Sequence, residues 1–314
     1  MKIYSAVKLP EHVIKLFSDK NYELDMHDEL TTPTKEEILS GTKVADALIT
    51  GVNTPVDKDI IGSGTNLKVI SNVGAGYNHI DIIAAKEHNI AVTNSPADAS
   101  TDSTAENAIM LMLMLSRDIK NAQPIAEENN FNGWQVMGYL GGNQVTGKTL
   151  AIIGLGTIGQ RIAQMAQAFD MKIIYVDLEE KPVPFKRMKL EDALPLSDFV
   201  VLQMNYTPEN HHMISENTFD LMKPSSFLIN NARGGIVDET ALADALDQNK
   251  IKGAALDVHE FEPEISDKLQ NRYNVILTPH IGNDTIEARN AMAQIAVEQA
   301  IKALKGDILD YRVN

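Results

Sequence analysis

A glycine-rich turn between an apolar strand and an amphipathic helix constrains the fold of this chain most strongly. Gly154, Gly156 and Gly159 form a G-x-G-x-x-G pattern after the apolar run Thr149–Ile153 and at the start of a helical pattern over Ile158–Phe169. In this context the first glycine permits a tight turn, the second lets a pyrophosphate approach the backbone, and the third lets helix and strand pack closely. The pattern predicts a dinucleotide site with the diphosphate on the N-terminal amides of the helix.

The next predicted strand supplies the acidic residue that such a site requires. Lys172–Val176 ends at Asp177, close to the spacing of about 20 residues expected for a carboxylate that binds the ribose hydroxyls. A carboxylate there repels a 2′-phosphate, and the next three residues, Leu178 to Glu180, include no Arg or Ser. We therefore expect NAD rather than NADP. The alternative is a structural glycine turn followed by an ordinary surface aspartate.

Strand and helix signals alternate along the chain, which predicts parallel sheets covered by helices on both faces. The strands predicted before residue 100 are Ile3–Val7, Tyr22–Met26, Ala47–Ile49, Leu67–Asn72 and Ile90–Thr93. The later ones are Thr149–Ile153, Lys172–Val176, Phe199–Leu202, Phe227–Asn230, Ala254–Leu256 and Val275–Leu277. The predicted fold class is α/β, with two Rossmann-like, doubly wound parallel-sheet domains and a cleft between them.

Helical patterns indicate where the chain passes between the two domains. A long helix is predicted from Thr101 to Lys120, followed by a loop-rich connection over Asn121–Gly147. A last helix over Thr285–Leu304 is expected to return to the first domain. The predicted domains are residues 1–100 plus 286–314, and residues 101–285. Further helices are predicted at Glu11–Ser18, Thr34–Leu39 (with a Thr34–Glu37 capping box), Ile80–Glu87 and Glu239–Gln248.

The net charge and the residue composition exclude several kinds of partner and site. The chain has 28 Lys and Arg against 43 Asp and Glu, a net charge of −15, and no cysteine. We expect no binding to nucleic acid or to anionic membrane, because phosphate binding favours a basic face. Lack of cysteine excludes disulfides, a catalytic thiol and zinc–thiolate or iron–sulfur sites, and agrees with a cytoplasmic location. The most apolar run, Ala108–Leu115, is too short to cross a bilayer.

Two residues that follow predicted strands are suited to bind an anion and to transfer a proton. Arg233 lies among small residues after Phe227–Asn230, and its planar guanidinium suits a carboxylate, although pairing with nearby surface acids is the alternative. His280 follows Val275–Leu277 and is the usual type of proton donor to a carbonyl that becomes an alcohol. A carboxylate on its other ring nitrogen would fix its tautomer. Spacing alone does not choose between Glu260 and Glu262 for that role.

The remaining polar motifs are less specific. His211 and His212 are adjacent in a polar loop, and since adjacent residues rarely point at one metal, no metal site is expected. The turn Asn72–Tyr77 follows a predicted strand and contains Gly74 and Gly76. Its amides are placed to bind a small carboxylate, but a tight turn without ligand is an equally good interpretation.

Taken together, these motifs resemble the D-isomer-specific 2-hydroxyacid dehydrogenase family, which includes glyoxylate and hydroxypyruvate reductases, D-lactate dehydrogenase and phosphoglycerate dehydrogenase. The resemblance rests on the order and spacing of Asn72–Asp81, Thr104–Glu106, Gly154–Gly159 with Asp177, Asn231–Asp238, Ala255–Pro263 and Thr278–Gly282. It implies an NAD-dependent oxidoreductase that reduces a small 2-keto acid to the D-2-hydroxy acid by hydride transfer. It further implies a homodimer, a flavodoxin-like substrate domain (1–100 plus 286–314) and an NAD-binding Rossmann domain (101–285).

The resemblance also assigns roles to individual residues. The implied catalytic residues are Arg233, Glu262 and His280, which favours Glu262 over Glu260. The implied substrate-binding groups are Arg233 and the backbone amides of Val73 and Gly74. Residues implied to contact the cofactor are Thr104, Gly154, Gly156, Thr157, Ile158, Gly159, Asp177, Asn205, Asn210, Ala232, Asp257, His280 and Gly282, with Asp257 near the nicotinamide amide.

Some residues depart from the family pattern, and two alternatives stay open. The family often has proline where Asn205 stands, and His259 and Phe261 are not its commonest residues at their positions. Formate dehydrogenases of this superfamily have Gln where Glu262 stands, so the Glu–His pair favours keto-acid chemistry. One alternative is an NAD(H)-sensing co-repressor-like protein without turnover. The other is a dehydrogenase of a larger or phosphorylated acid, for which Lys68 and Lys86 are the nearest cations in sequence to the Asn72–Tyr77 turn.

Overall fold

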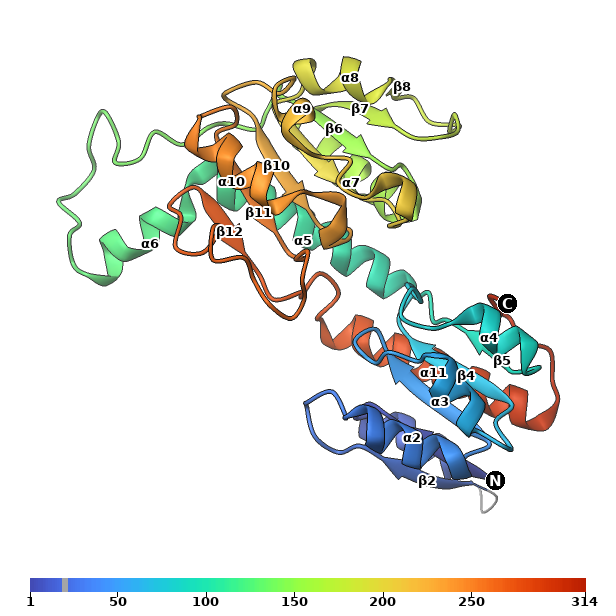
Figure 1. Ribbon diagram of the computed structural model, residues 1–314. Coiled ribbons are helices and arrows are strands. Elements are labelled where there is room, and N and C mark those ends of the chain that lie inside the picture. The colour runs from blue at the N-terminus through green and yellow to red at the C-terminus, as the bar shows by residue number, and fades with distance from the viewer. Residues whose placement is uncertain (19–21) are drawn as a thin grey trace. The chain divides into compact units, whose positions relative to one another are not determined.

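The computed structural model describes residues 1–18 and 22–314, which divide into two compact units. The first unit comprises Met1–Ser100 and Thr285–Asn314, and the second comprises Thr101–Asp284. Each contains a parallel sheet with helices packed on it, as Figure 1 shows. Among the described residues, no helix is both long and apolar enough to cross a membrane. The prediction of two α/β parallel-sheet domains is confirmed.

Within its described residues, the first unit has a five-stranded sheet in the order β2-β1-β3-β4-β5. The strands are β1 Lys2–Ser5, β2 Glu23–Met26, β3 Ala47–Gly51, β4 Val69–Val73 and β5 Ala91–Thr93. The helices are α1 Glu11–Ile14, η1 Lys15–Phe17, α2 Lys35–Val44, α3 Lys58–Ser63, α4 Ile82–Glu87 and α11 Ile286–Lys305. All paired strands are parallel, with Ile3 opposite Ala47 and Ile49 opposite Ser71.

Alternate residues of these strands pack against different helices. Ile49 and Val69 lie in one cluster with Val297 of α11, whereas Leu48 and Ile70 lie in another that includes residues of α2, α3 and α4. Successive side chains of a strand point to opposite faces, so a sheet covered on both faces needs continuous apolar runs rather than alternation. The fully buried strand β3 follows this rule.

The second unit, over the residues described, has a seven-stranded sheet in the order β12-β11-β10-β9-β6-β7-β8. Its strands are β6 Thr149–Ile153, β7 Lys172–Val176, β8 Lys186–Arg187, β9 Phe199–Leu202, β10 Phe227–Asn230, β11 Gly253–Leu256 and β12 Val275–Leu277. Its helices are α5 Asp98–Arg117, α6 Ile119–Glu127, α7 Thr157–Gln167, α8 Leu190–Ala193, η2 Leu194–Leu196, η3 Pro208–Asn210, α9 Glu216–Phe219, η4 Gly234–Ile236 and α10 Glu239–Asp247. Residues of α5 and α7 pack in one cluster on this sheet and residues of α10 in another.

Several predicted element boundaries need correction. The long helix α5 begins at Asp98, earlier than predicted, and ends at Arg117, where Asp118 takes a left-handed conformation (φ 55°). The chain then forms α6, so the loop-rich connection begins after Glu127 rather than at Asn121. Helix α3 and the two-residue edge strand β8 were not predicted, because they are too short to show a clear apolar period. The capping box is present, with the Glu37 amide bound to Thr34 and the Thr34 amide bound to Glu37.

Candidate active site

The glycine turn after β6 has the geometry that a dinucleotide requires. Gly154 has φ 96°, and a Cβ there would lie 2.4 Å from the carbonyl oxygen of Gln203. A Cβ on Gly159 would lie 2.3 Å from the Gly154 carbonyl oxygen, so the close approach of helix and strand excludes a side chain. A Cβ on Gly156 would meet no protein atom within 4 Å. Packing within the protein therefore does not require glycine at position 156. In a motif of this kind, the missing side chain leaves space for the ligand.

The start of α7 is open to an anion. Gly156 is its N-cap, and no side chain in the described part of the chain caps the helix there. The first amides of a helix have no acceptor within the helix, and they carry its positive dipole end. The amides of Thr157 and Ile158 are among them, and their contact with a pyrophosphate stays a prediction. A strongly acidic chain can thus hold a diphosphate through backbone groups alone.

Asp177 is bound to the same turn. Its Oδ2 accepts the Leu155 amide at 2.8 Å, and its Oδ1 accepts the Glu179 amide at 3.2 Å. Burial raises the pKa of Asp177, but these two hydrogen bonds and the charge of Lys181 outweigh burial, and the net effect lowers the pKa. The carboxylate is therefore ionised and oriented, as a ribose acceptor must be.

Two cations that the sequence analysis overlooked lie beside Asp177. Lys181 Nζ is 3.5 Å from the Asp177 carboxylate, and Arg187 Nε donates to the Asp177 carbonyl at 3.0 Å. The sequence prediction considered only the three residues after Asp177, whereas Arg187 reaches it from the neighbouring strand β8. No sequence signal indicated this contact, because β8 is too short to show an apolar period.

The loop after β9 is held by its own side chains. Asn210 donates to the Asn205 carbonyl at 2.7 Å and accepts the Thr207 amide at 2.8 Å. Thr104 of α5 offers its carbonyl to Asn231, beside the buried Ala232. These positions stay predicted cofactor contacts, and the side chain of Asn210 already has a structural partner on both its donor and its acceptor side.

The side chains of Glu262 and His280, for which an acid–base role is predicted, are in contact with each other. Glu262 Oε2 lies 2.9 Å from His280 Nδ1, and Glu262 Oε1 accepts the His259 amide at 2.9 Å. Burial raises the pKa of Glu262, but the hydrogen bond and charge of His280 outweigh burial and lower it overall. The other ring nitrogen, Nε2, is thereby left to face a ligand. Both side chains are about one-third exposed, so the pair is accessible.

The backbone at His280 is held in an uncommon conformation. His280 has φ 55°, in the left-handed region that few non-glycine residues adopt outside special turns. Its amide donates to the Asp257 carbonyl at 2.8 Å and to the Thr278 carbonyl at 3.1 Å. Such conformations persist where the surroundings over-determine them, which is frequent at functional sites.

Arg233 has the surroundings of an anion-binding group. It follows β10, and among the described residues its guanidinium makes one hydrogen bond, from Nη1 to the Ala232 carbonyl at 2.7 Å. Burial lowers the pKa of Arg233, and the nearby charge of Glu262 offsets this in part. Within the described residues Arg233 has no carboxylate within ion-pair distance, so the alternative of a paired surface arginine is disfavoured. Its remaining donors can bind a carboxylate and a keto oxygen.

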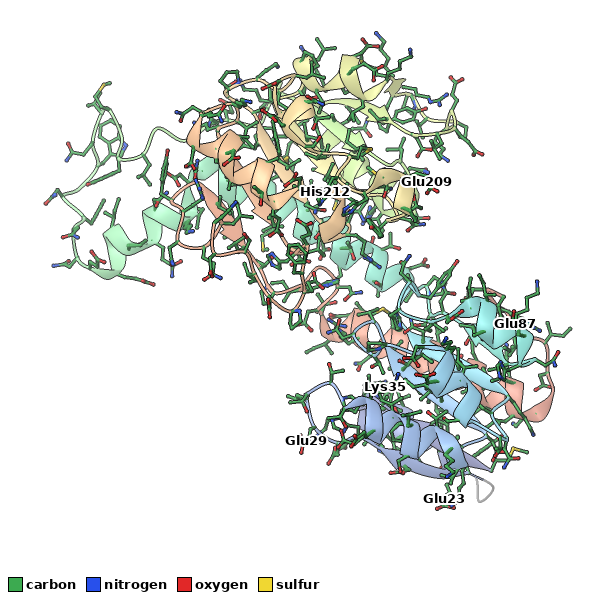
Figure 2. The ribbon with its side chains drawn as sticks, viewed as in Figure 1. Glu23, Glu29, Lys35, Glu87, Glu209 and His212 are labelled. Carbon is green, nitrogen blue, oxygen red and sulfur yellow. The ribbon has the colours of Figure 1, made fainter. Side chains whose placement is uncertain are left out.

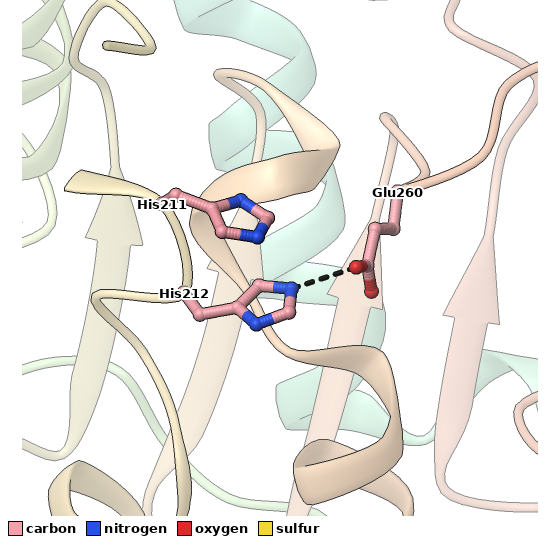
Figure 3. A group of neighbouring side chains, drawn as sticks. All are labelled: His211, His212 and Glu260. Carbon is pink, nitrogen blue, oxygen red and sulfur yellow. Dashed lines mark hydrogen bonds and ion pairs between the residues drawn. The ribbon is translucent and has the colours of Figure 1, made fainter. Parts of the chain in front are cut away.

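The structure separates the two glutamates that spacing could not. Glu260 Oε1 lies 2.6 Å from His212 Nε2, and Glu260 exchanges backbone–carboxylate hydrogen bonds with Glu239. Figure 3 shows Glu260 directed at His212, with His211 stacked on His212. Ligand atoms of His211, His212 and Glu260 lie within 4.8 Å of one another, close enough to hold an ion. However, stacked rings direct their nitrogens side by side rather than to one point, and the hydrogen bond accounts for His212.

The turn after β4 differs in detail from its predicted role. The Gly74 amide donates to Ser95 Oγ at 2.7 Å, so this amide is engaged inside the first unit. The amides of the exposed Ala75 and the half-buried Gly76 have no acceptor among the described residues. The open amides thus lie after Gly74, and the roles of Val73 and Gly74 as carboxylate donors stay predictions. If the Gly74 amide bound a substrate carboxylate, its hydrogen bond to Ser95 would be lost.

The two lysines nearest in sequence to this turn lie at the other end of the sheet. Lys68 directly precedes β4, whereas the turn follows it, and Lys86 is in the last turn of α4, shortly before β5 begins. Figure 2 shows Glu23, Glu29 and Glu87 projecting from the first unit, and all three are exposed. Neither lysine is therefore placed at this turn to bind a phosphate group of a substrate.

Comparison with known proteins places these features in a wider group. Residues 109–282 match the family model described as "D-isomer specific 2-hydroxyacid dehydrogenase, NAD binding domain". A Staphylococcus saprophyticus protein provisionally named a 2-hydroxyacid dehydrogenase is 44% identical, with all of both chains covered.

Solved structures of this family have the same fold as this chain. A Thermus thermophilus protein superposes with a TM-score of 0.95 at 32% identity, covering all of both chains. A D-lactate dehydrogenase from Aquifex aeolicus, complexed with NAD and lactic acid, gives a TM-score of 0.84 at 28% identity, covering 98% of this chain and 96% of that one.

Proposed function

Because the chain belongs to the D-isomer-specific 2-hydroxyacid dehydrogenase family and has its NAD-binding domain, we propose that it reduces a small 2-keto acid to the D-2-hydroxy acid. The observation that carries the proposal is the unpaired guanidinium of Arg233 near the Glu262–His280 pair. Arg233 is a partly buried cation with no ion-pair partner among the described residues. Glu262, which pairs with His280, lies close enough for its charge to raise the pKa of Arg233 in part. An unpaired guanidinium beside an acid–base pair is suited to a substrate that has both a carboxylate and a carbonyl.

Each residue has a distinct proposed task. Arg233 binds the carboxylate and polarises the keto oxygen. His280 donates a proton from Nε2 to that oxygen while Glu262 holds Nδ1 and stabilises the charged ring. The turn after β4 binds a carboxylate through open amides, for which Ala75 and Gly76 are the best donors. When bound, NADH supplies the hydride that adds to the keto carbon.

The residues around the nucleotide turn fit NADH. The open amides at the start of α7 suit the diphosphate, and the ionised Asp177 suits two ribose hydroxyls. We propose a preference for NADH over NADPH on the charge of Asp177. Lys181 and Arg187 reduce this preference, because each places positive charge near the position of a 2′-phosphate.

We also propose a cytoplasmic homodimer. The segment after α6 extends from the seven-stranded sheet in Figure 1 and exposes Trp134 (82%), Val136 (82%) and Met137 (91%), with Tyr139 also exposed. Large apolar side chains this exposed are costly in an isolated chain and typical of an interface. Sedimentation velocity of the wild type and of a Trp134→Ser, Met137→Ser variant tests this. A wild-type monomer at micromolar concentration would contradict it.

The test of the function is NADH consumption with glyoxylate, hydroxypyruvate, pyruvate and branched 2-keto acids, repeated with NADPH. We expect turnover of at least one small acid, loss of turnover in His280→Ala, and unchanged NADH binding in that variant. A matched control is His88→Ala, since the His88 side chain bonds only to the Ala84 carbonyl of α4 within the described part of the chain. NADH binding without turnover of any acid would instead support a sensor or an enzyme for a larger substrate.

A further inference from the structure

His259 is a buried histidine to which the proposed mechanism gives no role. It lies three residues before Glu262, in the segment after β11, and is 5% exposed. A histidine this buried needs partners for its ring nitrogens, because an unpaired polar atom in the interior is unfavourable.

The contacts of His259 join the two segments that carry the acid–base pair. Its amide donates to Glu262 Oε1 at 2.9 Å. Its ring Nε2 lies 3.0 Å from the carbonyl oxygen of Thr278, a geometry in which Nε2–H donates. The same Thr278 carbonyl accepts the amide of His280 at 3.1 Å. One residue therefore holds the carboxylate of Glu262 by its main chain and the turn of His280 by its side chain.

The other ring nitrogen is oriented toward a buried acid. His259 Nδ1 lies 3.9 Å from Glu239 Oε1. Among the described residues neither this nitrogen nor Oε2 of Glu239, which is 3% exposed, has a hydrogen-bond partner. Glu239 is held in place because its Oε1 accepts the Glu260 amide at 2.9 Å. Glu239 Oε1 thus lies on the Nδ1 side of the ring, opposite to Nε2, which points at Thr278. A residue that merely filled space would need none of these contacts.

We propose that His259 is a positioning residue, whose imidazole holds the Thr278 carbonyl and thereby keeps His280 in its left-handed turn, aligned with Glu262. The inference rests on the proposed function, because it concerns the orientation of the same acid–base pair. His259 does not touch substrate or cofactor. It acts on the reaction through the geometry of His280 and Glu262.

Two amide substitutions separate this role from simple packing. In His259→Gln the side-chain amide reaches close to the position of Nε2 and can still donate to Thr278, whereas in His259→Asn it reaches only the position of Nδ1. We expect His259→Asn to lower kcat by about tenfold to a hundredfold, as misplacement of a catalytic group does, with KM and the Kd for NADH little changed. His259→Gln should restore most of the rate. Equal losses in both variants, or loss of NADH affinity in step with kcat, would overturn the proposal.

A second measurement does not depend on turnover. Hydrogen exchange of the 277–282 segment, followed by mass spectrometry, should be faster in His259→Asn than in the wild type and nearly unchanged in His259→Gln. If the wild type reduces no 2-keto acid but this difference is present, the proposed function fails and the role of His259 in the turn stands. If exchange is the same in all three proteins, the positioning role is wrong, whatever the activity. Thermal unfolding of each variant shows whether it is folded.

Discussion

The carboxylate of Asp257 accepts the hydroxyl of Thr278 at 2.6 Å, which ties the end of β11 to the segment that follows β12. Asp257 is 1% exposed and also accepts the amides of Ile281 at 2.9 Å and Gly282 at 2.8 Å. The residues bound in this way, Thr278, Ile281 and Gly282, flank His280 in the sequence on both sides. Asp257 thus has a structural task besides the nicotinamide contact predicted for it, because it shapes the loop that presents His280.

Asp257→Asn should therefore destabilise the protein and lower kcat together. The new amide NH2 replaces one acceptor oxygen, so it opposes a donor and leaves at least one buried group unpaired. We expect a loss of about 1–3 kcal/mol in the free energy of unfolding, from urea denaturation. Thr278→Val removes only the hydroxyl bond and should cost about 1 kcal/mol. If Asp257→Asn were no less stable than Thr278→Val, the loop would not depend on the carboxylate as described.

Arg233→Lys should raise KM for the keto acid and lower kcat, with the Kd for NADH unchanged. A lysine keeps the charge but cannot make two parallel hydrogen bonds to a carboxylate. The loss in kcat/KM should be about tenfold to a hundredfold, equivalent to about 1.4–2.8 kcal/mol. The matched control is Arg272→Lys, since Arg272 pairs with Asp247 near the start of β12. An equal effect of both substitutions would show that Arg233 acts through stability alone.

Asp177→Asn should weaken NADH binding and reduce the discrimination against NADPH. The substitution removes the negative charge that repels a 2′-phosphate and leaves Lys181 and Arg187 in place. We expect the ratio of kcat/KM for NADH to that for NADPH to fall by about tenfold, a change of about 1.4 kcal/mol. Glu180→Gln, at an exposed position nearby, should leave the ratio unchanged. A ratio that stays constant in Asp177→Asn would remove Asp177 from the basis of cofactor choice.

Glu262 and Glu239 should affect stability with opposite dependence on pH. The pKa of Glu262 is lowered in the folded state, so its stabilisation is present above the ordinary Glu pKa and is lost as pH falls through the folded value. The pKa of Glu239 is raised, chiefly by burial, so its contribution is present below the ordinary pKa and is lost as pH rises through the folded value.

This difference is measurable by urea unfolding at two pH values. One is about pH 7, well above the ordinary Glu pKa of about 4.3, and the other is about pH 4, just below it. Relative to the wild type, Glu262→Gln should be less stable at the higher pH, with a smaller difference at the lower pH. Glu239→Gln should become more stable relative to the wild type as pH rises. Parallel curves for the two variants would contradict the opposite pKa shifts.

Much of the fold followed from patterns confined to short stretches of sequence. The apolar runs that became β3, β6 and β9 were evident because a strand covered on both faces must be apolar throughout. Short or weakly apolar elements such as α3 and β8 were missed, because their formation depends on neighbours rather than on their own periodicity. Asp118 ends α5 through a left-handed backbone that no apolar pattern announces.

By itself the sequence determined the nucleotide turn through its motif, and the close approach that excludes a side chain at Gly159 arises within the β6–α7 turn itself. The close approach at Gly154 is to Gln203 after β9 and depends on the pairing of β6 with β9. The sequence also placed Arg233 and His280 at strand ends. The family resemblance already favoured Glu262 over Glu260, and the tertiary structure added their separate partners. Only the tertiary structure brought Arg187 to Asp177, engaged Gly74 with Ser95, and set His259 between two loops. The physical reason is that these are contacts between residues from different strands and loops, and their partners are decided by which strands lie side by side and how the loops pack, not by spacing along the chain.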